Sequence, residues 1–104
     1  MEVIDYEDYC WYLLKHDGKL FLDGNYNHSA FGYDFMIQLN ETEEQVFKEK
    51  GRDYIHGLYH EIQYSAPILK DSKSEFKNRK VPKEFAVLAG KACEVWNKKH
   101  GKHG

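Results

Sequence analysis

Alternating apolar and polar positions give the clearest structural signal in this chain. Over residues 31–40 every odd position is Phe, Tyr, Ile or Leu, and the even positions are Gly, Asp, Met, Gln and Asn. A period of two is typical of a strand with one buried face, because successive side chains point to opposite sides of a sheet. The pattern predicts a strand over about 30–39.

Two shorter apolar runs, 9–15 and 19–23, flank the dipeptide Asp17-Gly18. That dipeptide accepts the positive φ angles of a type I′ turn, so the runs predict a β-hairpin. A two-residue turn fixes three cross-strand pairs: His16 with Lys19, Leu14 with Phe21, and Tyr12 with Asp23. Residues 24–29 are rich in turn formers and indicate a connector. We therefore expect a three-stranded antiparallel meander.

A helical period follows the last strand. Asn40 or Thr42 can cap a helix there, and the residues from Thr42 to Gln45 fit a capping box with acids in the first turn. One face of the segment 42–64 then collects apolar residues at 100° per residue: Phe47, Tyr54, Ile55, Leu58, Tyr59 and Ile62. Gly51 falls within this stripe. We expect one long or bent helix over about 42–64 with Gly51 against the sheet; two helices broken at Gly51 are the alternative.

A polar, lysine-rich segment over 65–81 separates this helix from the next. Pro82 suits the first turn of a last helix over about 82–99. Its apolar face would consist of Phe85, Leu88, Ala89, Ala92, Val95 and Trp96. The fold class expected is α+β, with two helices packed on one face of the sheet. A chain of 104 residues indicates a single domain, and residues 98–104 are expected to form a flexible tail.

The charge is unevenly distributed along the chain. Residues 1–64 carry 13 acidic and 5 basic residues, a net charge of −8, whereas residues 65–104 carry 4 acidic and 10 basic residues, a net charge of +6. Such polarity bears on partners and association rates rather than on the fold. The first residues lack the basic start and apolar run of a signal peptide, and no apolar run approaches the length of a membrane span. Cys10 and Cys93 stand far apart without metal-ligand spacing, so we expect a cytoplasmic protein.

The strongest candidate for catalytic or metal chemistry is the pair His56 and His60, which could share a metal ion. No glutamate stands between them, and both are expected on the solvated face of the helix, so two exposed histidines are the favoured interpretation. Cys10 lies among acidic residues, which disfavour a thiolate, and Cys93 is expected to be a small buried hydrophobe. No nucleophile elbow or phosphate-binding loop is present. We expect no metal, no cofactor and no enzymatic activity; a metal protein using His56 and His60 is the alternative.

The basic segment from Lys70 to Lys83 could contact nucleic acid. Asp71 and Glu75 interrupt it, and the acidic half of the chain would repel a nucleic acid. The favoured interpretation is a solvated loop. A homodimeric accessory protein that contacts nucleic acid through this loop remains as a further alternative.

Two helices cover only one face of a three-stranded sheet, so the other face should be exposed. That face mixes aromatic residues, Met and acids. Tyr, Trp and Met are enriched at protein interfaces, and an uncovered apolar patch ringed by polar groups marks a binding site. We predict a partner-binding surface on it, with apolar anchors and steering carboxylates: Asp5, Tyr6, Glu7, Asp8, Tyr9, Tyr12, Phe21, Asp34 and Met36. The alternatives are that the chain's own 65–81 segment or N-terminus covers this face, or that a second copy does.

The chain resembles the small immunity proteins that accompany bacterial polymorphic toxins of the contact-dependent and Rhs types. The resemblance lies in the residues Tyr9-Cys10-Trp11-Tyr12 before a short meander, Ser29-Ala30-Phe31 opening the alternating strand, Leu39-Asn40-Glu41-Thr42-Glu43-Glu44 entering a helix, Gly51 in that helix and Trp96 in the last one. It implies a cytoplasmic inhibitor that occludes the active site of a toxin, such as a basic nuclease-like domain. It implies no catalytic motif.

Overall fold

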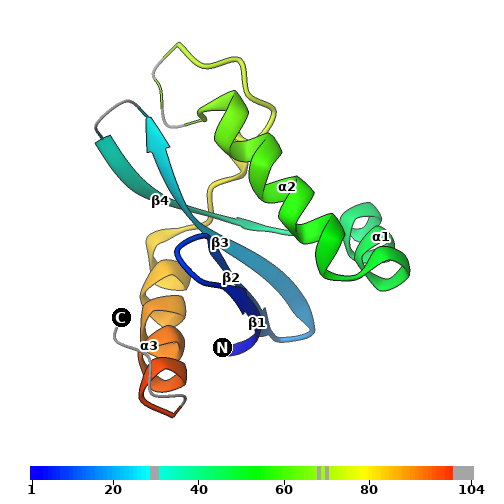
Figure 1. The fold of residues 1–104 in the computed structure, drawn as a ribbon, viewed down its shortest axis with the longest axis vertical. Helices are drawn as coiled ribbons and strands as arrows, with labels where there is room; N and C mark the ends of the chain where they lie inside the picture. Colours follow the sequence, from blue (N-terminus) through cyan, green and yellow to red (C-terminus); the bar gives the residue numbers. More distant parts are fainter. Residues whose placement is uncertain (29–30, 68, 70, 100–104) are drawn as a thin grey trace.

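In the residues that the structure describes (1–28, 31–67, 69 and 71–99), four strands form one antiparallel sheet and three α-helices cover both of its faces (Figure 1). The coordinates are a computed structural model. The strands follow the order β1-β2-β3-β4: β1 (Glu2–Glu7), β2 (Trp11–His16), β3 (Lys19–His28) and β4 (Phe31–Gln38). The helices are α1 (Glu41–Lys50), α2 (Arg52–Ser65) and α3 (Lys83–Lys99), with a 3₁₀ turn η1 (Lys77–Arg79) before α3.

The predicted hairpin is confirmed residue by residue. His16 pairs with Lys19, Leu14 with Phe21 and Tyr12 with Asp23. Asp17 and Gly18 both have positive φ, 51° and 75°, as a type I′ turn requires. The α+β class and the antiparallel pairing are therefore as the sequence predicts.

The prediction of three strands is wrong, because β1 adds a fourth at the edge of the sheet. Its register against β2 shifts between Val3 and Asp5, where the strand has a bulge or irregularity. This shift interrupts the alternation of side chains, so the segment shows no clean period of two. Its three acidic residues are also more typical of a surface loop than of a strand.

Strand β3 runs five residues beyond its predicted end, through the segment expected to be a connector. Gly24 belongs to this extension, and the ring of Tyr26 lies directly over it. A Cβ atom at position 24 would overlap the Cζ and hydroxyl oxygen of Tyr26. The glycine here therefore serves a close side-chain approach within a strand rather than a turn.

The predicted single helix over 42–64 is wrong, and the alternative of two helices is confirmed. Gly51 separates α1 from α2 with φ 72° and ψ −152°, a conformation that other residues rarely adopt. The expected contact of Gly51 with the sheet is also wrong, since no side chain or backbone atom lies within 4 Å of its Cβ position. Of the two candidate caps, Asn40 is the one that caps α1. The capping box predicted over Thr42 to Gln45 is wrong, because the reciprocal bonds join Asn40 to Glu43.

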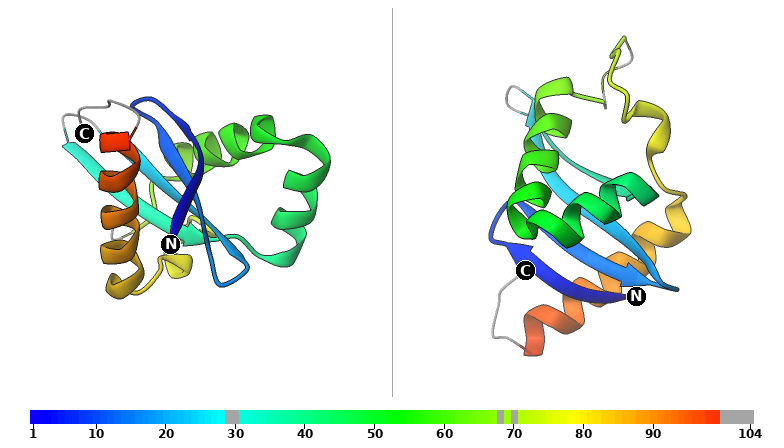
Figure 2. Two further views of the ribbon diagram at one scale, coloured as in Figure 1. Left: turned by 90° about the horizontal axis from the view of Figure 1, so that it is seen from below. Right: turned by 90° about the vertical axis from the view of Figure 1, so that its right-hand side faces the viewer.

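Helix α3 lies on the opposite face of the sheet from α1 and α2, which overturns the prediction that both predicted helices share one face (Figure 2). Apolar side chains of α3 pack on a cluster to which every strand contributes: Val3, Leu14, Phe21 and Met36. The face expected to be exposed is therefore covered. The helix also includes Lys98 and Lys99, which were expected in the flexible tail; residues 100–104 lie outside the described part.

The chain reaches this second face by passing along the outer edge of β4. Val81 donates its backbone N–H to the carbonyl oxygen of Met36 at 3.0 Å, and Lys80 forms an isolated bridge with Ile37. Arg79 donates to the carbonyl oxygen of Gln38 at 2.9 Å. These bonds hold residues 79–81 against the sheet edge, directly before α3 crosses the far face.

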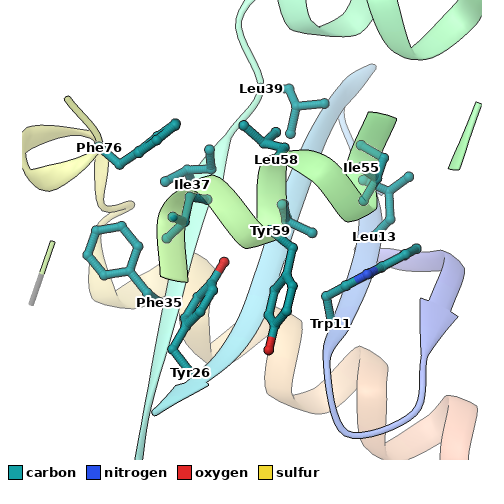
Figure 3. Packing of buried hydrophobic residues seen from close by; sticks show 12 residues of the cluster. Trp11, Leu13, Tyr26, Phe35, Ile37, Leu39, Ile55, Leu58, Tyr59 and Phe76 are labelled. Carbon is teal, nitrogen blue, oxygen red and sulfur yellow. The ribbon is translucent and has the colours of Figure 1, made fainter. Parts of the chain in front are cut away.

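The larger core cluster lies between the sheet and α2, as the predicted apolar faces require. Figure 3 shows Tyr59 of α2 beside Tyr26 of β3, with Trp11 and Leu13 next to Ile55. The rings of Tyr26 and Tyr59 stack with centroids 4.9 Å apart. This cluster fixes the start of β2 against α2, and so positions the turn between β1 and β2.

Candidate functional site

A hollow of about 520 Å³ opens where the β1–β2 turn, the middle of β3, β4 and the C-terminal half of α3 meet. We call it the acidic hollow. Its lining residues are Tyr6, Glu7, Asp8, Tyr9, Cys10, Trp11, Tyr12, Asp23, Gly24, Asn25, Asp34, Gly90, Cys93 and Asn97. Six of the nine predicted partner-binding residues are among them: Tyr6, Glu7, Asp8, Tyr9, Tyr12 and Asp34.

The β1–β2 turn presents Tyr9 to solvent at the rim of the hollow. The Cys10 N–H donates to the carbonyl oxygen of Glu7 at 3.0 Å, and the Asn25 N–H donates to that of Cys10 at 2.8 Å, so the turn is tied to β3. Tyr9 has φ 64° and is 95% exposed. Left-handed backbone is unfavourable for a bulky residue. An aromatic side chain is thus held fully in water at a conformational cost.

One wall of the hollow is aromatic. The rings of Tyr6 and Tyr12 stack with centroids 6.1 Å apart, and Tyr6 meets the ring of Trp96 edge-on at 5.6 Å. The Tyr12 hydroxyl donates to Oδ1 of Asn97 at 2.9 Å. Tyr6 and Tyr12 are therefore packed against α3 and form a rigid wall, unlike the freely exposed Tyr9.

The floor of the hollow carries Asp23 from β3 and Asp34 from the neighbouring β4. Burial, and then the charge of Asp34, raise the pKa of the Asp23 carboxyl to about 7. Among the described residues, neither carboxyl has a hydrogen-bond or ion-pair partner, and the lining includes no Lys, Arg or His. A desolvated carboxyl beside a second one is stabilised by a cation, so the hollow is suited to a positively charged group.

Asp5 and Glu7 are already partly neutralised within the molecule. Arg52 of α2 bonds the Glu7 carboxylate at 2.6 Å and that of Asp5 at 3.5 Å, and it also donates to the carbonyl oxygen of Tyr6. Asp5 does not line the hollow. Of the other predicted steering acids, Asp8 and Asp34 also line the hollow.

Two of the predicted anchors lie in the core instead of on a surface. Phe21 is 2% exposed and Met36 is 4% exposed, both beneath α3, and Phe21 stacks on Phe85 at 5.4 Å. Placing them on an exposed face is wrong, because the sequence does not state on which face the last helix packs.

Eight lining residues were not predicted as site residues: Cys10, Trp11, Asp23, Gly24, Asn25, Gly90, Cys93 and Asn97. Three of them belong to α3 and enter the site only because that helix crosses the second face. Asp23 had a signal in the sequence, since its predicted pairing with Tyr12 already placed it on that face.

Both cysteines line the hollow as free thiols. Burial, followed by the charges of Asp23 and Asp34, raises the pKa of Cys93 to about 12. At neutral pH its thiol therefore stays protonated and is a poor nucleophile. Cys93 packs with the cluster under α3, in line with its predicted role as a small apolar residue.

His56 and His60 lie one turn apart on α2, away from the lining of the hollow. His60 is exposed, as predicted, but His56 is half-buried and accepts a hydrogen bond from Trp11. In the described part of the chain, no group of three or more His, Cys, Asp or Glu residues is placed to hold a metal ion.

In the basic segment 70–83, Arg79 forms an ion pair within the molecule. Arg79 bonds both carboxylate oxygens of Glu43, at 2.5 and 2.8 Å, and Phe76 is 2% exposed. Lys77 donates to the carbonyl oxygen of Leu69 at 2.8 Å. These contacts make it a structural crossing rather than a free basic arm; Lys70 lies outside the described residues.

The substitution Asp23→Asn should stabilise the protein above the raised pKa of Asp23, but not at acidic pH. The folded-state pKa of Asp23 is raised, so the unfolded chain loses this proton at a lower pH than the folded one, and stability falls as the pH rises from about 4 to about 7. Asp23→Asn removes that loss. We expect the free energy of unfolding to rise on the order of 2 kcal/mol at about pH 8 and to change little at about pH 4.

Urea denaturation at the two pH values measures this effect. Asp53→Asn, at an exposed site on α2, is the matched control and should change little at either pH. An equal shift for Asp23→Asn at both pH values would contradict the assignment of the raised pKa to Asp23.

The fold and the hollow define the class: a four-stranded antiparallel sheet between helical layers, with an acidic, aromatic recess at one end of the sheet. Comparison of the chain with protein-family models, with curated proteins and with solved structures found no match. Among the described residues, no helix is both long and apolar enough to cross a membrane.

Proposed function

We propose that this chain is a non-enzymatic protein-binding protein, an immunity-type inhibitor that acts in the cytoplasm and occludes the active site of a cognate toxin. The observation that carries the proposal is the lining of the acidic hollow: four carboxyl side chains and no basic one among the described residues. Such a recess is complementary to a basic side chain of a partner. A nuclease-like toxin, whose substrate is polyanionic, would present such side chains around its cleft.

Tyr9 supports a protein as the ligand rather than a small cation. It is 95% exposed beside the hollow, and a tyrosine supplies a large contact area with few rotatable bonds. The stacked wall of Tyr6 and Tyr12 behind it is rigid. An exposed aromatic anchor next to a preformed recess is typical of the few residues that dominate an interface.

Immunity can be tested by co-expression with a candidate toxic domain taken from a neighbouring open reading frame. The wild-type chain should restore growth, and the double variant Tyr9→Ala/Asp34→Asn should not. Both residues are exposed, and alanine carries the same Cβ atom as tyrosine, so it should add no backbone strain at residue 9 and the fold should persist. In a direct titration with that domain, the variant should bind at least about 30-fold more weakly.

The chain offers a closely matched control. Tyr64 is 94% exposed and Asp53 is exposed, and both lie on α2 away from the hollow. Tyr64→Ala/Asp53→Asn removes the same chemical groups and should protect like the wild type. Failure of the wild type to protect would reject the inhibitor function, and protection by both double variants would reject the hollow as its site.

A further inference from the structure

Trp11, His56 and His60 form a continuous chain of ring nitrogens between β2 and α2. The Trp11 Nε1 atom lies 3.3 Å from Nδ1 of His56, and the Nε2 atom of His56 lies 3.1 Å from Nε2 of His60. The two imidazole rings are almost perpendicular, at 88°. Trp11 is 2% exposed, whereas His60 is on the surface, so the chain leads from the core to solvent.

The position of each proton in this chain follows from the first donor. An indole N–H can only donate, so Nδ1 of His56 must accept and carries no proton. A neutral imidazole holds one proton, which must then be on Nε2 of His56. That N–H donates to Nε2 of His60, whose own proton is consequently on Nδ1 and faces away from His56.

We propose that the two histidines form a neutral relay that latches Trp11 to α2, and that one added proton on either histidine releases the latch. Protonated His56 carries a proton on Nδ1, which then faces the indole N–H. Protonated His60 carries a proton on Nε2 and must donate it to Nε2 of His56. Since Nε2 of His56 then accepts, the proton of neutral His56 must lie on Nδ1. In both cases two donors meet at Trp11, and a buried indole N–H loses its acceptor.

The elements next to the relay carry several charged and titratable groups. These groups are Arg52, Asp53, Tyr59 and Glu61 on α2, Asp5 and Glu7 on β1, and Asp8 and Cys10 in the β1–β2 turn. Arg52 lies over the Trp11 ring with its guanidinium carbon 5.3 Å from the ring centroid. The guanidinium of Arg52 is bound in turn by the β1 carboxylates of Asp5 and Glu7.

The relay acts on the turn that forms the rim of the acidic hollow. Trp11 begins β2 directly after Cys10, whose carbonyl oxygen binds Asn25, and it lines the hollow itself. Release of the indole should loosen this rim as the pH falls from about 8 to about 5, the range in which histidines usually gain a proton. That consequence for partner binding rests on the proposed function, whereas the relay itself does not.

The test uses the isolated full chain, without a partner, and nitrogen-detected NMR of its histidines. At about pH 8, His56 should show its proton on Nε2 and His60 on Nδ1. On acidification to about pH 5, the solvent-exchange protection of the Trp11 indole proton, relative to free tryptophan at the same pH, should fall about tenfold. The Trp96 indole proton, assigned with Trp96→Phe, should keep its protection and so report that the fold is intact.

Variants separate the relay from a general response to acid. His56→Phe removes the acceptor, and the Trp11 indole proton should be unprotected at both pH values. His16→Gln, at a histidine outside the relay, should leave the response of the wild type unchanged. A proton on Nδ1 of His56 at about pH 8, or undiminished protection of Trp11 while both histidines titrate, would overturn the relay. Neither result depends on whether the chain inhibits a toxin.

Discussion

Replacement of Gly24 by alanine is expected to destabilise the protein by about 3 kcal/mol or more. The added methyl group would occupy the space taken by the Tyr26 ring, whose outer end lies directly over Gly24. Tyr26 is fully buried and stacked on Tyr59, so its ring cannot move aside without disturbing the core. For a domain whose total stability is about 5–15 kcal/mol, this loss is a large share.

Urea denaturation followed by tyrosine and tryptophan fluorescence measures the change. Gly57→Ala is a control of opposite sign, because nothing lies within 4 Å of its Cβ position in α2 and alanine should stabilise the helix by about 0.5–1 kcal/mol. The double variant Gly24→Ala/Tyr26→Leu should recover part of the loss, since the shorter side chain leaves room for the methyl group. Equal stability of Gly24→Ala and the wild type would refute the close approach of Tyr26.

Removal of the Arg79 side chain should cost about 2–3 kcal/mol at neutral pH. Arg79 binds both oxygens of Glu43 and the carbonyl oxygen of Gln38, and Glu43 is in turn part of the cap of α1. Arg79→Ala leaves a carboxylate that is only 11% exposed without its cation. The estimate lies below that for a fully buried pair because the Arg79 side chain is 26% exposed.

The acid dependence of stability gives a second measurement of the same contact. Burial by itself would raise the pKa of Glu43, but the hydrogen bonds from Arg79 and Asn40 and the charge of Arg79 hold it below the ordinary value of 4.5. The stabilisation is therefore present above that value and is lost as the pH falls through the lowered folded-state pKa. Stability of Arg79→Ala should decline less on going from about pH 7 to about pH 3 than stability of the wild type.

Lys80→Ala is the matched control for this prediction, because Lys80 is exposed and its bridge to Ile37 uses the backbone. It should change the free energy of unfolding by less than about 0.5 kcal/mol. If Arg79→Ala behaved in the same way, the crossing segment would not depend on this ion pair.

The predicted site and the observed site share residues but not their geometry. The sequence analysis selected four of the lining residues because they stood on or beside a face expected to be exposed: Tyr6, Tyr9, Tyr12 and Asp34. They line the acidic hollow because α3 covers only part of that face. The helix leaves the acidic hollow beside its C-terminal half. Residues near the β1–β2 turn remain accessible there, whereas Phe21 and Met36, farther along the strands, are buried.

The sequence by itself determined those features that depend on neighbours along the chain. The Asp17-Gly18 turn set the register of β2 on β3, the period of two divided β4 into two faces, and Asn40 was one of two candidate caps for the start of α1. These follow from backbone sterics and short-range hydrogen bonds. Only the tertiary structure decided on which face α3 packs, because an apolar helix stripe fits either side of a sheet. The bonds of Arg79 and Val81 to β4 and the cluster under α3 belong to that arrangement, which also forms the acidic hollow.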